Sequence, residues 1–374
     1  MKNILIISSG TQGTIPRLTF TLYQALVNCE GCRVFVAVMH DSGANPFPTD
    51  SSFVYSQKRF CSYLSKIRFL RKLKKAQKID ISISTIISCN VFNVLSKVND
   101  KTIGVFHAPL IQAKYLGYLA YLRNKMCYRF IFPKLDRRYA VCKSVRLDVE
   151  LHTGCPAQVV YNIHDFDKIS VCAEEPLCTN EDVIFQRPTI LYVGHLLDEK
   201  GVRRLISAFS KVTVNSNLVF VGGDEVHGTE PVSYKALVKA EGIEDKVFFL
   251  GFQENPFKYM KNCSTLVLPS YSEGLPGVLI EALYLNKKVI TTNSSKGVWE
   301  IMQCYEDYRE NLSKPFRTEL GIIVSNSDTN NECIKQLADS ICQILGESRP
   351  NILPFDKTRF DKITLTNYYT NLEL

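Results

Sequence analysis

The amino-acid sequence predicts an α/β protein of two Rossmann-like, doubly wound domains. Short apolar runs alternate with stretches of helical periodicity from the first residues onward, which is typical of parallel sheets covered by helices. The same rhythm restarts at Thr189. The chain has 374 residues, more than one ordinary hydrophobic core holds. These observations place the expected ligand site in the cleft between two domains, at the carboxyl ends of the strands.

The expected elements of the first domain begin at the N-terminus. Ile4–Ile7 predicts a strand, because a signal peptide would need a longer apolar run and a cleavage site. Helical periodicity follows over Leu18–Leu26, and a second strand is expected at Val34–Val38. A later strand, Thr102–Phe106, runs into His107, so this imidazole should emerge at the cleft end of its strand. No run of about 18 apolar residues occurs, and we expect no transmembrane helix.

The second domain is expected to begin with the strand Thr189–Val193. Its next elements are a helix over Val202–Val212, strands at Leu218–Val221 and Thr265–Leu268, and a helix over Pro276–Leu285. The stretch just before Thr189 is acidic, contains two prolines and lacks periodicity, which indicates a linker between the domains. We therefore expect a first domain over 1–170, a linker over 171–188, a second domain over 189–354 and a terminal helix over 355–374.

Composition and charge restrict the function. The chain is 45% hydrophobic and 22% charged, as in soluble globular proteins. Its 13 cysteines are odd in number and scattered, which favours buried thiols in a reducing cytoplasm. Residues 1–170 hold 24 Lys and Arg against 10 Asp and Glu, whereas the rest holds 21 against 27. The first domain is therefore expected to meet an anionic partner, such as phospholipid head groups or a lipid diphosphate.

Two acidic residues eight positions apart, Glu273 and Glu281, form the most informative motif. The first lies in a loop with Gly and Pro behind it, and the second lies about one turn inside the predicted helix. Backbone N–H groups at the start of a helix favour phosphate. A carboxylate inside the helix can accept hydrogen bonds from a ribose diol, while one in the loop can reach sugar hydroxyls. The pattern predicts a clamp on the two ends of a nucleotide sugar.

This segment resembles the Glu-x7-Glu signature of the retaining glycosyltransferases of family 4. The likeness covers roughly residues 140–325 and extends to Val247–Phe252, Leu266–Ser270, Ile190–Gly194 and the interdomain element from Asn162 to Asp165. The resemblance implies the GT-B arrangement, with the last helix returning to pack on the first domain. It also implies three catalytic residues, Glu273 on the sugar, Lys200 on the leaving diphosphate and His107 near the sugar. The donor-binding residues that it implies, besides Glu281 on the ribose, are Gly13, Gly194, His195, Gly222, Gly223, Phe252, Gly274, Leu275, Pro276, Gly277 and Val278.

Several of these positions have a plain structural alternative. Lys200 follows a strand and a Gly in the manner of a phosphate-neutralising cation, but a solvated loop lysine is the alternative. The family usually has Arg where this chain has His195, and an imidazole donates fewer hydrogen bonds without a fixed charge. Gly13, Gly222 and Gly223 lie in strand-to-helix turns that need glycine about as often for structure as for a ligand. A lone His107 is often a packing residue.

The most basic stretch of the chain, segment 58–78, has apolar residues at helical spacing on one side. It predicts either an amphipathic helix on an anionic membrane surface or a packed helix with a solvated basic face. A second basic and aromatic stretch, Lys114–Arg138, favours membrane contact. No nucleic-acid motif accompanies the charge. The Asp165-Phe166-Asp167 pattern is typical of metal-binding glycosyltransferases, but its junction position favours turn capping, so we expect no metal and no cofactor.

The function predicted from these features is transfer of a hexose or N-acetylhexosamine with retention. The donor is expected to be a nucleotide-diphosphate sugar, UDP-linked, and the acceptor a glycan on a polyprenyl diphosphate, in capsule, O-antigen or lipopolysaccharide synthesis. The protein is expected in the cytoplasm, peripheral on the inner face of the membrane. Alternatives are a phosphorylase or epimerase of the same fold and a non-catalytic nucleotide-sugar binding protein, which His195 favours.

Overall fold

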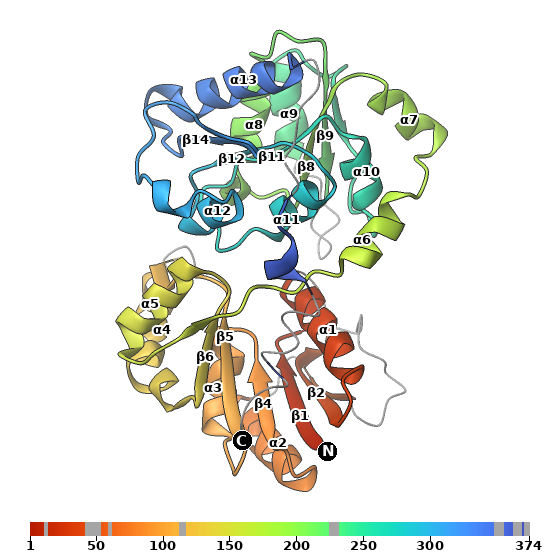
Figure 1. Ribbon diagram of the computed structural model, residues 1–374. Helices are drawn as coiled ribbons and strands as arrows, with labels where there is room; N and C mark the ends of the chain where they lie inside the picture. Colours follow the sequence, from red (N-terminus) through yellow and green to blue (C-terminus); the bar gives the residue numbers. More distant parts are fainter. Residues whose placement is uncertain are drawn as a thin grey trace. The chain divides into compact units, whose positions relative to one another are not determined.

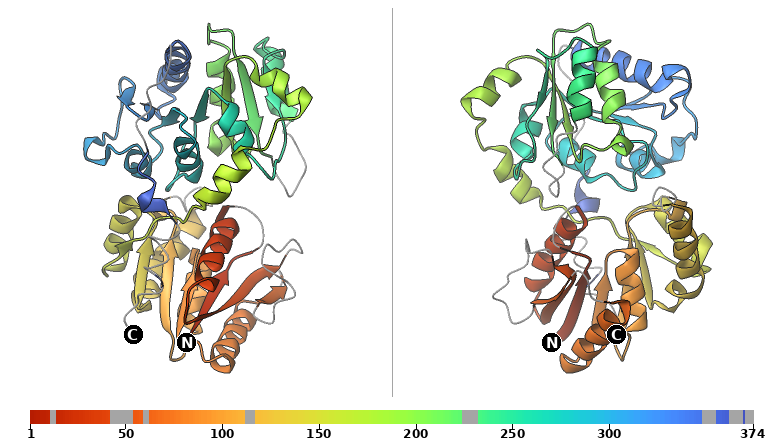
Figure 2. Two further views of the ribbon diagram at one scale, coloured as in Figure 1. Left: turned by 45° about the vertical axis from the view of Figure 1, so that its right-hand side comes forward. Right: turned by 180° about the vertical axis from the view of Figure 1, so that it is seen from behind.

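The computed structural model describes residues 1–10, 14–41, 54–58, 62–111, 117–223, 232–347, 355–361 and Tyr369. The chain divides into two compact units, which Figures 1 and 2 show from three sides. Unit 1 comprises Met1–Asp165 together with Thr358–Leu374, and unit 2 comprises Phe166–Lys357. Each unit is built around its own seven-stranded sheet, so the prediction of two α/β domains is confirmed.

Unit 1 has a parallel sheet with the strand order β3-β2-β1-β4-β5-β6-β7. Alternate side chains of β2 face opposite layers: Phe35 and Ala37 pack with α2 and α3, whereas Val36 and Val38 pack with α1. Helices therefore cover both faces of the sheet, as a doubly wound domain requires. The strands are β1 (Lys2–Ser8), β2 (Cys32–Asp41), β3 (Val54–Lys58), β4 (Ile81–Ser84), β5 (Lys101–Phe106), β6 (Arg137–Ala140) and β7 (Gln158–Val159); the helices are α1 (Thr14–Val27), α2 (Tyr63–Ala76), α3 (Ile87–Leu95), α4 (Tyr118–Phe130), η2 (Phe132–Lys134), α5 (Lys143–Thr153) and η6 (Thr358–Phe360).

Unit 2 has the strand order β10-β9-β8-β11-β12-β14-β13. One face packs on α8, α9 and α13 through a large apolar cluster, and α11 lies against β11 and β12. The strands are β8 (Thr189–Val193), β9 (Asn217–Val221), β10 (Val247–Phe249), β11 (Thr265–Leu268), β12 (Val289–Thr292), β13 (Phe316–Thr318) and β14 (Gly321–Val324). The helices are α6 (Phe166–Ala173), α7 (Thr179–Phe185), η3 (Asp198–Lys200), α8 (Val202–Phe209), α9 (Val232–Ala240), α10 (Phe257–Asn262), α11 (Gly277–Tyr284), α12 (Lys296–Ile301), η4 (Tyr305–Asp307), η5 (Thr329–Asn331) and α13 (Glu332–Leu345).

The structure differs from the sequence-based expectation at three places. The first unit ends at Asp165, and the expected linker 171–188 holds the end of α6 and all of α7, which belong to unit 2. Strand β13 runs antiparallel to β14 at the sheet edge, because a tight turn ending at Gly321 reverses the chain. The expected helix over 355–374 is described at its start, where η6 is a 3₁₀ turn, and at Tyr369, and most of its length lies outside the described residues.

The C-terminal segment belongs to unit 1. The backbone N–H of His164 donates to the carbonyl of Phe360 at 2.9 Å, and the two stretches form a short parallel bridge. Tyr369 packs edge-on against Tyr139 of β6, with ring centroids 5.5 Å apart. Two chain segments therefore cross between the units, at Asp165–Phe166 and at Lys357–Thr358.

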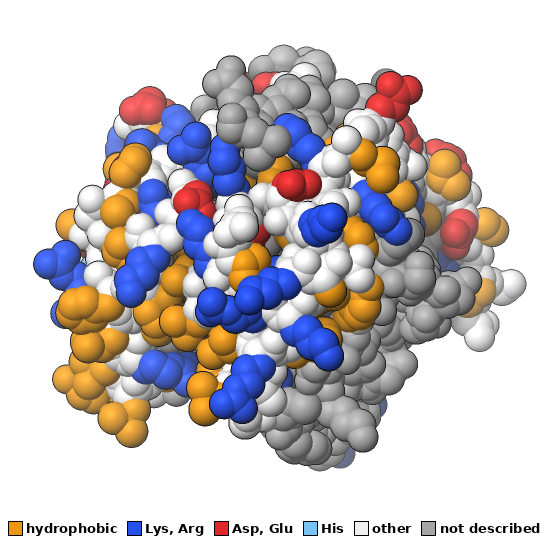
Figure 3. Space-filling model, turned by 90° about the horizontal axis from the view of Figure 1, so that it is seen from below, with side chains coloured by type: hydrophobic (Ala, Val, Ile, Leu, Met, Phe, Trp, Pro, Cys, Tyr) orange, Lys and Arg blue, Asp and Glu red, His pale blue; other side chains and the backbone are white. Residues whose placement is uncertain are grey.

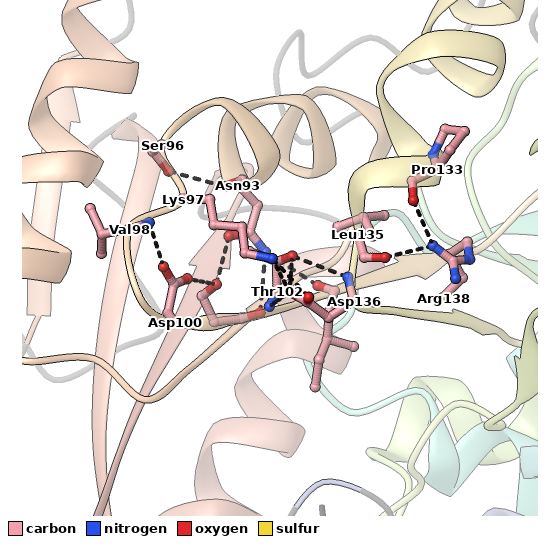
Figure 4. A network of polar contacts seen from close by, with 12 residues as sticks. Asn93, Ser96, Lys97, Val98, Asp100, Thr102, Pro133, Leu135, Asp136 and Arg138 are labelled. Atoms are coloured by element: carbon pink, nitrogen blue, oxygen red, sulfur yellow. Dashed lines mark hydrogen bonds and ion pairs between the residues drawn. The ribbon is translucent and has the colours of Figure 1, made fainter. Parts of the chain in front are cut away.

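A buried ion pair lies beneath the unit 1 sheet. Lys74 Nζ is 2.8 Å from Asp100 Oδ2, and both side chains are fully inaccessible. Lys74 also donates to Asn93 Oδ1 at 2.7 Å, and Ser82 Oγ donates to Asp100. Figure 4 shows Asp100 and Asn93 together with the neighbouring pair of Lys97 and Asp136. Burial lowers the pKa of Lys74, and the carboxylate of Asp100 opposes that shift.

None of the described helices combines the length and the hydrophobicity needed to cross a bilayer.

Candidate functional site

The candidate site of unit 2 lies where the strand order reverses. β8 and β11 are neighbours in the sheet but are separated in the chain by β9 and β10, and ligands of open α/β sheets bind at the carboxyl ends of strands at such a point. Lys200 follows β8 at the end of η3, and Glu273 follows β11. Lys200 Nζ lies 3.0 Å from Glu273 Oε1, and the two side chains are 26% and 14% exposed. The structure thus brings together two predicted catalytic residues that still face solvent in part.

Backbone contacts hold these two loops together. The N–H of Tyr271 donates to the carbonyl of Glu199 at 3.0 Å. Gly201 has φ +72°, and a Cβ there would lie 2.0 Å from the carbonyl oxygen of Pro269. Only glycine fits this position, because both the positive φ and the close approach exclude a side chain. The position of Lys200 is therefore fixed by the residue that follows it.

Arg204 of α8 supports the same loop from beneath. Its guanidinium carbon lies 3.5 Å from the centroid of the Tyr271 ring, and its side chain is 2% exposed. It donates to Asn326 Oδ1 and to Asp328 Oδ1, each at 2.7 Å. Sequence reasoning missed Arg204, because it stands beside the exposed Arg203 and no pattern separates the two. The network orients the segment that leads to Glu273.

The signature segment enters α11 as expected, one residue later than the predicted start. Ser295 Oγ donates to the carbonyl of Gly274 at 2.9 Å, and a Cβ on Gly297 would lie 2.0 Å from that same oxygen. These contacts fix the chain just before the helix begins at Gly277. Glu281 is only 4% exposed, one turn inside α11. Among the other predicted donor residues here, Leu275 and Pro276 are buried, whereas Gly274, Gly277 and Val278 are partly exposed.

The glycine turns after β8 and β9 pack directly on each other. Gly194 N donates to the Val221 carbonyl at 3.0 Å, and Gly222 N donates to the Gly251 carbonyl at 2.8 Å. A Cβ on Gly222, whose φ is +137°, would lie 1.9 Å from the carbonyl oxygen of Gly194. Close packing of turns is therefore sufficient reason for glycine at this position. The predicted donor residues at this edge are Gly223, partly exposed, with Phe252 and His195, both exposed.

His195 is held through its backbone. The hydroxyl of Tyr192 donates to the His195 carbonyl at 2.6 Å, while the imidazole is exposed. Burial raises the pKa of Tyr192 well above its usual value, so this hydroxyl stays a donor at any physiological pH. The imidazole is thus placed at the β8 edge of the site without a fixed orientation of its ring.

Two predicted site residues belong to unit 1. His107 follows β5, and its ring nitrogens are buried without a hydrogen bond of good geometry in the described structure. Burial lowers the pKa of His107 to about 4, and the side chain of Asn162 partly opposes the shift. Its imidazole is therefore neutral near pH 7. Gly13 lies outside the described residues.

The basic segment 58–78 is largely helix α2, and its apolar side packs on the core from Ile67 onward, whereas Tyr63 and Leu64 are exposed. Leu70 and Leu73 are buried in the unit 1 core, with Ile67 packed against it. Two of its lysines are buried too: Lys74 pairs with Asp100, and Lys66 Nζ lies 2.9 Å from His40 Nδ1. The structure thus shows a packed helix. Its exposed cations within the described residues are Arg68, Arg71, Lys72, Lys75 and Lys78.

Within the described ranges, no three His, Cys, Asp or Glu side chains come together as metal ligands would.

Residues 182–318 match the family of glycosyl transferases group 1. An uncharacterized glycosyltransferase of Methanocaldococcus jannaschii is 31% identical over 44% of this chain and 41% of its own length. In Campylobacter jejuni, N-acetylgalactosamine-N,N'-diacetylbacillosaminyl-diphospho-undecaprenol 4-alpha-N-acetylgalactosaminyltransferase is 31% identical over 48% of this chain and 47% of its own length. The chain thus spans less than half of these two relatives. A second Campylobacter jejuni enzyme, GalNAc-alpha-(1->4)-GalNAc-alpha-(1->3)-diNAcBac-PP-undecaprenol alpha-1,4-N-acetyl-D-galactosaminyltransferase, is 28% identical over 82% of this chain and 83% of its own length.

Solved structures resemble the fold along the whole chain. A sucrose-phosphate synthase from Thermosynechococcus elongatus has a TM-score of 0.72 at 14% identity and covers 100% of this chain and 98% of its own. Anabaena HepE in complex with UDP-glucose has a TM-score of 0.70 at 14% identity, with 99% of each chain covered. At such identities the likeness establishes the fold, and the GT-B prediction is confirmed.

Proposed function

We propose, from the premise that this chain carries a glycosyl transferases group 1 domain over residues 182–318, that the protein is a retaining, metal-independent glycosyltransferase. The donor in this proposal is a nucleotide-diphosphate sugar, UDP-linked, and the transferred group is a hexose or N-acetylhexosamine. The observation that carries it is the pairing of Lys200 with Glu273 at the strand-order reversal of unit 2.

The proposed donor lies between the two acidic residues of the signature. Glu281, one turn inside α11, takes the ribose, and the backbone at the start of that helix takes the phosphates. Glu273 accepts hydrogen bonds from the sugar. Lys200, whose ammonium rests on Glu273 without ligand, moves its charge onto the departing diphosphate. A cation already positioned for a developing charge lowers the barrier, because little reorganisation is then needed.

In this proposal the acceptor hydroxyl attacks the face from which the diphosphate leaves, so no protein carboxylate acts as a nucleophile. His107, neutral because burial lowers its pKa, serves as a hydrogen-bond partner of the transferred sugar. The residues assigned here to donor binding besides Glu281 are Gly13, Gly194, His195, Gly222, Gly223, Phe252, Gly274, Leu275, Pro276, Gly277 and Val278.

The acceptor is proposed to be a glycan on a polyprenyl diphosphate, within the synthesis of a surface polysaccharide. By their names, the two Campylobacter jejuni relatives act on undecaprenyl-diphosphate-linked sugars. Such a lipid places the reaction at a membrane, so the proposed location is the inner face of the cytoplasmic membrane. The exposed cations of α2 are proposed to attract its anionic surface over a long range.

The test begins with the donor. Each nucleotide sugar of a panel is added to the protein and the unfolding temperature is measured; a donor at 100 times its dissociation constant stabilises by about 2.7 kcal/mol. The protein is then incubated with the stabilising nucleotide sugar and undecaprenyl-diphosphate-linked glycans in a buffer that contains a metal chelator. The anomeric configuration of the product is determined by NMR. An α-linked product from an α-linked donor is expected. Inversion of the configuration, or a requirement for added metal, contradicts the proposed mechanism.

A nucleotide-sugar binding protein without transferase activity is the second candidate, and His195 in place of the family's Arg favours it. The two candidates differ in one measurement. A binding protein is stabilised by the sugar but yields no product with any acceptor, and His195→Arg leaves that result unchanged.

A further inference from the structure

Helix α4 of unit 1 carries its apolar side chains on the outside. Leu119 is 82% exposed, Met126 58% and Phe130 57%, whereas the residues that α4 buries are Asn124 and Tyr128. The exposed set, with Leu122 between, repeats every three or four residues and forms one stripe along the helix. An amphipathic helix of a soluble domain normally has the opposite arrangement. The stripe is therefore not explained by packing within unit 1.

The neighbouring helix α5 extends this surface. Leu151 is 77% exposed and Leu147 is 47% exposed, and they lie one turn apart. A groove between the two helices is lined by Leu122, Lys125, Met126, Arg129, Leu151 and His152. We call the stripe of α4 with Leu147 and Leu151 the α4–α5 face. Apolar side chains gathered in this way on a monomer indicate an interaction site.

The charge around the α4–α5 face identifies its partner. Within α4 there are three exposed basic residues, Arg123, Lys125 and Arg129, and no acidic one, while the two basic residues of α5 are balanced by its two acidic ones. Figure 3 shows Lys and Arg side chains, with few Asp and Glu, among the apolar ones on the side of unit 1 that it displays. Apolar side chains flanked by Lys and Arg suit the boundary between anionic head groups and acyl chains.

We propose that the α4–α5 face inserts into the surface of an anionic phospholipid bilayer. Leu119, Leu122 and Met126 enter the acyl boundary while Arg123 and Lys125 rest at the phosphates. This deepens the proposed function, on which it rests for the membrane acceptor, and it assigns insertion to α4 and α5 instead of α2. Leu70 and Leu73 of α2 are buried in the core, and the exposed apolar residues of α2 are confined to its first turn, at Tyr63 and Leu64.

A second copy of the chain is the competing occupant. A two-fold interface centred on α4 would place this basic helix near its own copy, so the cations of α4 in one copy would lie near the same cations of the other. Like charges at such a contact oppose association, whereas an anionic bilayer neutralises them. The charge therefore favours lipid.

The experiment is flotation of the full chain with phosphatidylcholine vesicles, with and without phosphatidylglycerol, and with no donor or acceptor. We expect flotation only with the anionic vesicles. Leu122→Gln and Met126→Gln should each lower the partition coefficient by about tenfold, and Arg123→Gln, Lys125→Gln and Arg129→Gln together by about 100-fold. Both sets replace exposed side chains, so circular dichroism and the unfolding temperature should stay as in the wild type.

Two control variants test whether flotation depends on the α4–α5 face. Val183→Gln replaces an exposed apolar residue of unit 2 and should float as the wild type does. The triple variant Arg71→Gln, Lys72→Gln and Lys75→Gln removes three cations from α2. The apolar residues of α4 should still insert, so its partition coefficient should fall less than that of the triple α4 variant. Wild-type flotation of the α4 variants, a larger loss for the α2 variant, or a concentration-dependent dimer that Leu122→Gln dissociates overturns the proposal. The vesicles hold no acceptor, so a failure of this experiment does not contradict the proposed transferase activity, which the donor and product measurements test separately.

Discussion

Lys200 Nζ and Glu273 Oε1 are 3.0 Å apart, although 73 positions separate the two residues in the chain. They come from loops after two adjacent parallel strands, so the sheet places both loops at the same edge. Each neutralises the other in the absence of ligand. A ligand that offers phosphate to the lysine and hydroxyls to the carboxylate replaces this contact with two others, so the pair can hold the leaving phosphate and the sugar of one donor.

We predict that Lys200→Met and Glu273→Gln each lower kcat for sugar transfer by about 100- to 1000-fold, because each removes a charge proposed to act in the transition state. The nucleotide-binding step should be affected less by Glu273→Gln than by Lys200→Met. Steady-state kinetics and donor titration measure both. As a control, Arg203→Gln breaks an exposed ion pair with Asp198 of the same loop and should leave kcat within about twofold. Equal losses for all three variants would point to a general disturbance of the loop.

Gly201→Ala should destabilise the protein more than Gly242→Ala does. Both glycines have positive φ, +72° and +66°, but only the Cβ at 201 would meet another atom, the carbonyl oxygen of Pro269 at 2.0 Å. The backbone strain that both alanines share costs about 1–2 kcal/mol. Any further loss of unfolding free energy in Gly201→Ala measures the cost of the contact with the Pro269 carbonyl. Urea unfolding of the two variants measures it. Indistinguishable midpoints would mean that the two loops separate at little cost.

Asp100→Asn is predicted to lower the free energy of unfolding by about 3–5 kcal/mol, because Lys74 would remain buried without its anion. Lys97→Gln breaks a partly exposed pair with Asp136 and should cost about 1 kcal/mol or less. Denaturant titration of both variants provides the comparison. A small loss in Asp100→Asn would contradict a buried charge on Lys74 that depends on this carboxylate.

His107 should make the folded state less stable as the pH falls from about 6.5 to about 4. Burial lowers its folded-state pKa to about 4, so in this window the unfolded chain binds a proton that the folded chain does not. The free energy of unfolding should then fall by about 1.4 kcal/mol per pH unit from this residue alone. The contribution of His107 to the free energy of unfolding is constant above about pH 6.5, and it is fully lost below about pH 4.

His107→Gln should remove that component, so the difference in unfolding free energy between wild type and variant should change with pH only inside the window. A His107→Gln variant with the wild-type slope would show that the ring is solvated in solution.

Local patterns were sufficient to predict the strands that frame the unit 2 site. Thr189–Val193 and Thr265–Leu268 are continuous apolar runs, and parallel strands covered on both faces require such runs, so their bounds match β8 and β11. The helix expected over Val202–Val212 ends at Phe209, because the apolar periodicity continues past the last helical residue into a turn.

Other features depend on contacts that no local pattern encodes. Arg204 is buried because Tyr271, Asn326 and Asp328 surround it, and these come from distant parts of the chain. The charges of α2 were predicted as one surface, yet Lys66 and Lys74 are themselves buried and find partners from outside the segment. The exposed stripe of α4 was missed as such, since periodicity gives the face of a helix but not the layer that it meets.

The return of residues 358–374 to unit 1 has a consequence for biosynthesis. Unit 2 is continuous in the chain, whereas unit 1 lacks its last segment until everything in between has left the ribosome. At about 5–20 residues per second, the 166–357 stretch delays that completion by roughly 10–40 s. During this interval the His164 backbone and the Tyr139 ring await their partners from the C-terminal segment, so chaperone dependence should be concentrated in the half that is translated first.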